Sequence, residues 1–167
     1  MRPFNQDGHT FISYAVNELI ELSATGNNTV TIPAKRKFKA KPSEVLPPTI
    51  LTLPTTVNHF VMNLPASAID FLGSYKSVYH GQEKLFEPYT KAKLPMVHVH
   101  CFSTKSADNA REAVEICGRI SEKLGHKVEV GDPDLSIHDV RDVAPNKRMF
   151  CASFRIPAEV AFRDPST

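Results

Sequence analysis

The stretch His59-Phe-Val-Met-Asn-Leu-Pro-Ala-Ser-Ala-Ile-Asp-Phe-Leu72 decides the fold of this chain. A short apolar run ends at Asn63-Leu64-Pro65, and a helical pattern follows at once. In this way a buried strand of an α/β sheet brings a polar side chain to the carboxyl edge, where such sheets bind ligands. The amide of Asn63 offers a donor and an acceptor together, and Pro65 fixes its own φ and lacks an N–H. Such a turn suits a group that holds a flat, nitrogen-bearing ring in one orientation.

Helical and strand patterns alternate along most of the chain. They predict helices from Asp7-Gly8 to Leu22, over 67–79 and over 107–124, and strands over 59–63, 96–102, 127–130, 136–143 and 149–156. Gly125 is expected to end the third helix, and Pro145-Asn146 to form the turn between the last two strands. This order predicts an α/β fold, the second half of a doubly wound sheet that ends in an antiparallel strand pair.

The same patterns predict the buried faces of the helices. In the second helix, capped by Ser67, the apolar stripe holds Ala68, Phe71, Leu72, Tyr75 and Tyr79. In the third helix it holds Ala110, Ala113, Val114, Cys117, Ile120 and Leu124.

The composition excludes several classes of protein. With 167 residues the chain has material for one core, or for part of a larger one. A net charge of +2 permits an RNA partner without arguing for one. No apolar stretch of membrane-spanning length exists, and the first residues lack the apolar core of a secretory signal. Three cysteines make a disulfide framework improbable and favour a reducing compartment.

Residues 29–57 differ in kind from the rest. They combine several prolines with the basic run Lys35-Arg-Lys-Phe-Lys-Ala-Lys41 and show little periodicity. We interpret them as an exposed, largely irregular insertion. The basic run suits a phosphate backbone or a nuclear import signal, and a solvated loop is at least as good an interpretation. Arg141, Lys147 and Arg148 are weaker candidates for contact with an RNA backbone.

The first half of the expected sheet is missing from these patterns. No G-x-G-x-x-G and no Walker sequence occurs in the chain. Either the chain binds no nucleotide-like cofactor, or the cofactor-binding half lies upstream of Met1.

Two histidines on one predicted strand are a further candidate site. His98 and His100 are two residues apart and share a face, a spacing that could hold a metal. No acidic residue or cysteine follows at ligand spacing, so a hydrogen-bonded structural pair is the better interpretation. Cys101 faces the other way and is expected in the core.

Four blocks in this order resemble one family: Asn5-Gln-Asp-Gly-His-Thr-Phe-Ile12, the stretch from His59 to Leu72, Val97-His-Val-His-Cys-Phe102, and Val140-Arg-Asp-Val-Ala-Pro-Asn-Lys-Arg-Met-Phe-Cys151. Together they look like the carboxyl-terminal part of the eukaryotic tRNA (guanine-N1)-methyltransferases. These enzymes methylate guanosine 37, next to the anticodon. The insertion at about 29–57 is the main part that the blocks leave uncovered, and it resembles the variable basic insertions of fungal members.

The resemblance implies a class I (Rossmann-like) S-adenosylmethionine-dependent methyltransferase fold, with residues 1–167 as the carboxyl-terminal portion of that domain. The glycine-rich cofactor loop, the general base and the tRNA-binding regions are then expected upstream of Met1. It implies S-adenosyl-L-methionine as cofactor and the tRNA anticodon stem-loop with guanosine 37 as partner. It also implies no metal, no membrane and a monomeric full-length form. The expected compartments are the cytoplasm, the mitochondrial matrix and the nucleus.

The resemblance also implies roles for five residues. Asn63 is expected to hold the target guanine and the methionyl end of the cofactor, while Leu64 and Pro65 shape the wall. Asp7 and Gly8 match the block that contacts the cofactor adenine, where a carboxylate can accept from the exocyclic amine. The alternatives are that Asn63 caps a strand-to-helix turn and that Asp7-Gly8 is a plain turn.

Three functional hypotheses follow from these expectations. The first is S-adenosylmethionine-dependent methylation of N1 of guanosine 37 by a longer enzyme, with this chain inactive alone. The second is a non-enzyme, either an inactive remnant or an accessory subunit that needs a partner half. The third is the wybutosine-pathway transferase, which moves a different group from the same cofactor; the Asn-Leu-Pro-Ala block argues against it.

Overall fold

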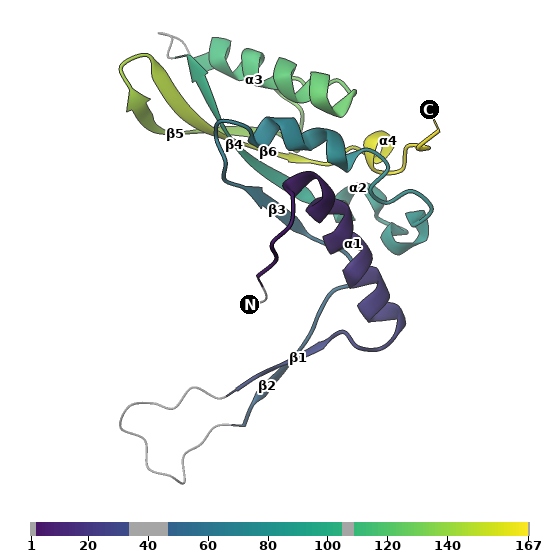
Figure 1. The fold of residues 1–167 in the computed structure, drawn as a ribbon. Helices are drawn as coiled ribbons and strands as arrows, with labels where there is room; N and C mark the ends of the chain where they lie inside the picture. Colours follow the sequence, from purple (N-terminus) through teal and green to yellow (C-terminus); the bar gives the residue numbers. More distant parts are fainter. Residues whose placement is uncertain (1–2, 34–46, 105–108, 167) are drawn as a thin grey trace, which may run out of the picture.

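The computed structural model describes residues 3–33, 47–104 and 109–166. Along the chain lie α1 (Gly8–Ala24), β1 (Thr29–Ile32), β2 (Thr49–Thr52), β3 (His59–Met62), the 3₁₀ helices η2 (Ala68–Tyr75) and η3 (Glu83–Phe86), α2 (Thr90–Lys93), β4 (Met96–Thr104), α3 (Asn109–Leu124), β5 (Ser136–Ala144), β6 (Lys147–Arg155) and α4 (Ala158–Ala161). Figure 1 shows a layered body and a narrow ribbon of β1 and β2 that projects from it.

The body is built on one mixed sheet with the strand order β3-β4-β6-β5. β3 runs parallel to β4, whereas β6 pairs antiparallel with both β4 and β5. Pro145 and Asn146 form the turn of the β5–β6 hairpin, as predicted. The α/β class and the closing antiparallel pair are therefore confirmed.

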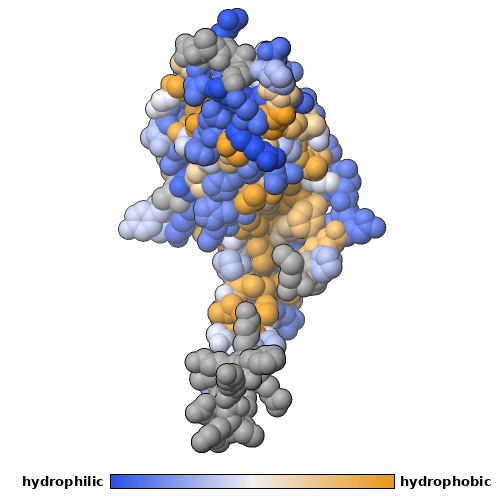
Figure 2. Space-filling model, turned by 90° about the vertical axis from the view of Figure 1, so that its left-hand side faces the viewer, coloured by the Kyte–Doolittle hydropathy of each residue, from blue (hydrophilic) through white to orange (hydrophobic). Residues whose placement is uncertain are grey.

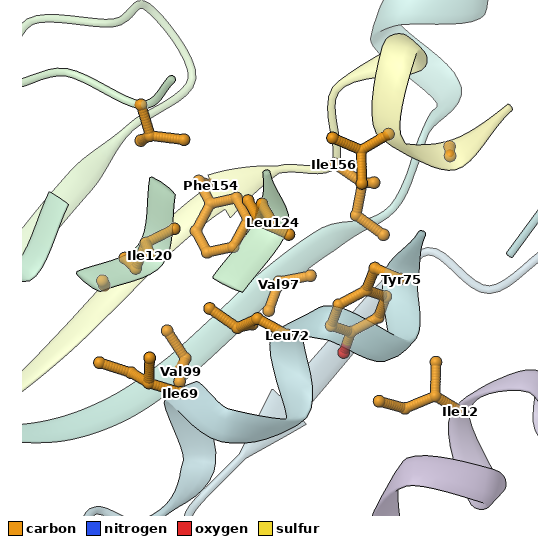
Figure 3. Close-up of a cluster of buried hydrophobic side chains, with 14 of the residues drawn as sticks. Ile12, Ile69, Leu72, Tyr75, Val97, Val99, Ile120, Leu124, Phe154 and Ile156 are labelled. Carbon is orange, nitrogen blue, oxygen red and sulfur yellow. The ribbon is translucent and has the colours of Figure 1, made fainter. Parts of the chain in front are cut away.

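α1, η2 and α3 cover one face of this sheet (Figure 1). The alternation along β4 puts Val97, Val99 and Cys101 on the covered face, where all three are fully buried. Figure 3 shows Leu72 from η2 and Leu124 from α3 packed near Val97 and Val99 of β4. The predicted core position of Cys101 is confirmed.

β3 is not the buried strand that the sequence predicts. Among the described residues it pairs with β4 alone, so it forms an edge of the sheet. Val61 is 69% exposed, and Phe60 and Met62 on the other face are only half-buried. An apolar run is typical of a strand that is covered on both faces. In this structure β3 lacks a neighbour on one side.

The second predicted helix is a 3₁₀ helix that ends at Tyr75 instead of Tyr79. Ser77 has a φ of 62°, which turns the backbone away from the helix axis. The N–H groups of Ser77 and Tyr79 then donate to the carbonyls of Val160 and Ala161, each over 2.9 Å. A tertiary contact with α4 thus replaces the last helical turn.

α3 follows the prediction from Asn109 to Leu124, while residues 107 and 108 lie outside the described part of the chain. Gly125 ends it with a φ of 60°. The predicted face is wrong at Ala110, which is exposed, and at Val114, which is 63% exposed, whereas Glu112 and Ile116 are buried. Glu112 lies against an arginine of the hairpin, as described below.

Residues 127–130 are not a strand. The Ser121 hydroxyl accepts from the Val128 N–H over 2.9 Å and donates its proton to the Cys117 carbonyl over 2.7 Å, with the Val128 carbonyl farther away at 3.2 Å. Because the side chain of an α3 residue takes the N–H of Val128, that donor is not available to a sheet.

The segment 29–57 is not wholly irregular either. Its ends pair as the antiparallel strands β1 and β2, with Val30 opposite Leu51. The basic run Lys35–Lys41 lies outside the described residues. In the described part of the chain, no helix is long and apolar enough to cross a membrane.

Candidate functional site

An open groove of about 520 Å³ runs along β3 on the side of α1 and η2. Gly8 and Phe11 come from α1, Asn63 and Leu64 from the turn after β3, and Phe71 from η2. Three predicted site residues, Gly8, Asn63 and Leu64, therefore line one groove, although Gly8 lies more than fifty positions before Asn63 in the sequence.

Asn63 is exposed at the carboxyl end of β3, and no hydrogen bond joins its amide to another described residue. The turn that follows is held by the backbone instead. The Leu64 carbonyl accepts from the N–H groups of Ser67 and Ala68, over 2.9 and 2.7 Å. The interpretation of Asn63 as a turn cap therefore finds no support, and its amide is available to a ligand.

Pro65 does not line the groove but fixes the turn to the sheet. Its carbonyl accepts from the N–H of Phe102, near the end of β4, over 3.2 Å. Ser67, the predicted helix cap, makes no capping bond through its side chain. Pro65 thus acts on the position of Asn63 through the backbone.

Asp7 and Gly8 build the start of α1. Asp7 is the N-cap, and its Oδ1 accepts from the N–H of His9 over 2.9 Å. A Cβ added to Gly8 would lie 3.1 Å from the ring of Phe71, so glycine permits the close packing of α1 on η2. Both residues have structural roles; Asp7 is exposed and does not line the groove, whereas Gly8 does.

Few titratable side chains line the groove. Among the described lining residues they are His59 and Tyr75. Burial raises the pKa of Tyr75, and its hydroxyl donates to the Met62 sulfur over 3.3 Å. His59 opens β3, roughly 13 Å along the strand from Asn63 at about 3.3 Å per residue. Neither side chain suits proton removal beside Asn63.

His98 is hydrogen-bonded on both ring nitrogens. Its Nε2 lies 3.0 Å from Nδ1 of His59, and its Nδ1 lies 2.8 Å from the Ser153 hydroxyl. Burial, and then the nearby His59, lowers the pKa of His98. The predicted structural role is confirmed for His98. The sequence analysis did not identify His59, because only the β3–β4 register brings it next to His98.

His100 behaves differently. Its Nδ1 is buried and finds no hydrogen-bond partner among the described residues. The prediction of a satisfied pair is therefore wrong for this histidine. In the described ranges no group of three His, Cys, Asp or Glu side chains could hold a metal.

Arg148 is not free to meet a nucleic acid. It lies 3.0 Å from Asp142 and 3.4 Å from both Glu112 and Asp139, and its side chain is 15% exposed. The hydrogen bond to Asp142 raises the pKa of the Arg148 guanidinium.

The other two candidate basic residues differ from Arg148. Lys147 and Arg141 are both exposed, and the Lys147 ammonium lies 3.9 Å from the centre of the Phe102 ring. Of the three candidates, these two remain accessible to an RNA backbone.

Comparison with known proteins gives a consistent set of relatives. The chain is 51% identical to a protein of Fusarium vanettenii, over 97% of this chain and 35% of that protein. It is 49% identical to a protein of Neurospora crassa, over 98% of this chain and 35% of that protein. It is 37% identical to a protein of Schizosaccharomyces pombe, over 99% of this chain and 36% of that protein. All three are named tRNA (guanine(37)-N(1))-methyltransferase.

No protein-family model matches the chain, and no solved structure does. The chain spans about a third of the length of the curated relatives it matches. The mixed sheet with its antiparallel pair is consistent with half of a methyltransferase domain. The resemblance carried by the four sequence blocks is confirmed: nearly the whole chain is similar to about a third of the fungal proteins named tRNA (guanine(37)-N(1))-methyltransferase.

Proposed function

We propose that this chain is the guanine-positioning part of a longer enzyme that methylates N1 of guanosine 37 in tRNA, with S-adenosylmethionine as the methyl donor. The observation that carries this proposal is the groove in which Asn63, Leu64 and Gly8 meet. The names of the relatives supply the substrate class. The cytoplasm, the mitochondrial matrix and the nucleus are the proposed compartments.

Methylation of N1 sets three chemical requirements. The N1 proton must leave, the charge that develops on O6 needs a donor, and the ring must lie in line with the methyl group. The amide of Asn63 can donate to O6 through its N–H and accept from a ring or amino N–H through its oxygen. Leu64 is 59% exposed and offers an apolar surface beside it. Pro65 keeps the turn against β4, so that Asn63 acts from a fixed position.

The residues of this chain fit one part of the cofactor. The exposed Asp7 carboxylate can accept from an adenine amino group, and Asn63 is a candidate contact for the methionyl end. S-adenosylmethionine, when bound, supplies the electrophilic methyl group. The chain contains no glycine-rich loop, and no suitable base lines the groove among the described residues. We therefore assign cofactor anchoring and proton removal to the remainder of the longer polypeptide.

A second candidate function is supported by the edge position of β3. A ligand crevice of an α/β sheet forms between neighbouring strands at their carboxyl ends. On one side of β3 no described strand is present. An accessory subunit that completes its site with a separate partner fits this observation equally well. The wybutosine-pathway transferase fits less well, because the relatives are named methyltransferases.

The role of Asn63 can be tested in a chimera in which this chain replaces the matching third of the Fusarium vanettenii relative. Asn63→Ala is expected to lower the rate of methyl transfer about 100-fold, because it removes one donor that meets the developing charge. The Kd for tRNA is expected to change by less than about twofold. Mass spectrometry of the product nucleoside identifies the group that is transferred.

Asn17→Ala is the matched control, since Asn17 is an exposed asparagine on α1 that does not line the groove. Equal turnover of the two variants would refute the role given to Asn63. A product other than N1-methylguanosine would refute the proposed reaction. Activity of this chain alone would contradict the assignment of the base to the longer polypeptide.

A further inference from the structure

The ribbon of β1 and β2 is apolar and exposed. Val30 is 43% exposed, Ile50 is 68% exposed and Leu51 is 46% exposed. The described residues 27–33 and 47–58 contain no charged side chain. Each strand has four residues, and an isolated two-stranded ribbon is marginally stable in water. A partner surface that covers these apolar side chains would therefore stabilise the ribbon.

The base of the ribbon is fixed to the body. The N–H of Leu53 donates to the Asn28 carbonyl over 2.6 Å, and the Asn28 amide donates to the Leu53 carbonyl over 3.4 Å. The hydroxyls of Ser23, on α1, and Thr55 lie 2.8 Å apart. These contacts hold both strands where they leave the body.

The ribbon continues into the groove beside β3. The N–H of Val57 donates to the Tyr79 hydroxyl over 3.2 Å, and Val57 itself lines the groove. Beyond it lie the half-buried Phe60 and the exposed Val61. Figure 2 shows apolar surface over the ribbon and on the part of the body above it. We call Val30, Ile32, Ile50, Leu51, Val57 and Val61 the ribbon–groove surface.

We propose that the ribbon–groove surface is an internal docking surface that the remainder of the longer polypeptide covers, while the end of the groove at Asn63 stays open to the guanine. This inference rests on the proposed function, in which the chain works as part of a longer enzyme. The match to the Fusarium vanettenii relative extends over 97% of this chain and therefore includes the ribbon, while about two thirds of that relative lies outside the match. The ribbon is thus shared with a protein that has further chain to cover it.

The chemistry of the ribbon–groove surface suits a protein. Its six residues are all apolar, and none is a Lys or Arg through which a phosphate backbone is bound; the basic run 35–41, which joins the two strands in the sequence, lies outside the described residues. Exposed apolar patches of this kind mark protein–protein contacts. In addition, the unpaired edge of β3 offers backbone groups to a further strand. The part of the longer polypeptide that fits here has an apolar surface and a strand that can pair with β3. The ribbon would hold that part against α1.

Hydrogen exchange tests this inference without a cofactor or tRNA. We compare this chain with the intact Fusarium vanettenii relative, peptide by peptide. Amides in the segments that match β1, β2 and β3 are expected to exchange at least tenfold more slowly in the intact relative. α3, which belongs to the folded body, serves as the internal reference. Equal exchange rates in the ribbon segments of both proteins would overturn the proposal.

Substitutions in the intact relative supply a second measurement. Lysine at the two positions matching Val30 and Leu51 is expected to lower the Tm and to restore fast exchange in the ribbon segments. Lysine at the positions matching Val114 and Val130 adds the same charge at exposed sites outside this surface, 63% and 55% exposed here, and is expected to change neither. Equal effects of both pairs would contradict the docking surface.

Two further outcomes would assign another occupant and overturn the proposal. Ribbon protection that appears only when tRNA is added would identify an RNA-binding arm. Protection that depends on protein concentration and accompanies a dimer mass would identify a second copy. Because no methyl transfer is measured, a failed docking test and a failed methylation test are distinguishable.

Discussion

β4 has two neighbours in the sheet, β6 and β3, and they differ in almost every respect. β6 pairs with β4 from Met96–Arg155 to Thr104–Lys147, and its Phe150, Ala152 and Phe154 are buried. β3 pairs with β4 through four residues, and its Val61 is 69% exposed. On the β6 side the sheet continues to β5, whereas on the β3 side no further described strand follows. Asn63, the principal candidate for chemistry, follows the strand on the open side, where another part of a longer protein can complete the site.

The largest expected effect on stability distinguishes the core of the body from the edge strand β3. Leu72 is fully buried between η2 and the sheet. Leu72→Ala is expected to lower the free energy of unfolding by about 2–5 kcal/mol, because it leaves a cavity in the core. Val61→Ala on β3 is expected to cost less than about 0.5 kcal/mol. Urea unfolding followed by circular dichroism measures both. Similar losses would show that the edge strand is as tightly packed as the core.

A smaller effect is expected at the charged contact that joins α3 to the hairpin. Glu112 is 2% exposed and lies 3.4 Å from Arg148. Arg148→Ala is expected to cost about 1–3 kcal/mol, since the buried carboxylate loses a charged donor. The double variant Arg148→Met, Glu112→Leu is expected to recover much of that loss in thermal unfolding. A double variant that is less stable than Arg148→Ala would show that the pair itself is stabilising.

The smallest expected effect is a dependence on pH across the β3–β4 boundary. The pKa of His98 is lowered from its ordinary value of 6.5, first by burial and then by His59. The unfolded chain then binds a proton more readily, so stability is full above pH 6.5 and falls as the pH drops below it. His98→Gln is expected to flatten that slope. Denaturant midpoints between pH 5 and pH 8 measure it, with His126→Gln, outside this cluster, as the control. Equal slopes in both variants would remove His98 as the cause.

Three of the five predicted site residues, Gly8, Asn63 and Leu64, line one groove, while Asp7 and Pro65 do not; the binding roles of all five stay predictions. The prediction that β3 is a buried strand was wrong, because an apolar run looks the same in the sequence whether or not a neighbouring strand is present. His59 and the unpartnered Nδ1 of His100 could not be found from spacing. Both depend on which strands become neighbours.

Local interactions explain what the sequence by itself determined. Asp7 caps α1, Gly125 ends α3 at a positive φ, and Pro145-Asn146 turns the hairpin. Each of these outcomes depends on a few consecutive residues, whose preferences the sequence displays directly.

Only the tertiary structure decided the rest. Val114 is exposed on α3, whereas Glu112 is buried beside Arg148 of the hairpin. Residues 127–130 form no strand, and the N–H of Val128 donates to the Ser121 hydroxyl instead. The N–H groups of Ser77 and Tyr79 donate to carbonyls of α4 instead of continuing the helix. In each case a group distant in the sequence competes with the local preference, and the hydrogen bond or ion pair that it forms outweighs a propensity of less than about 1 kcal/mol per residue.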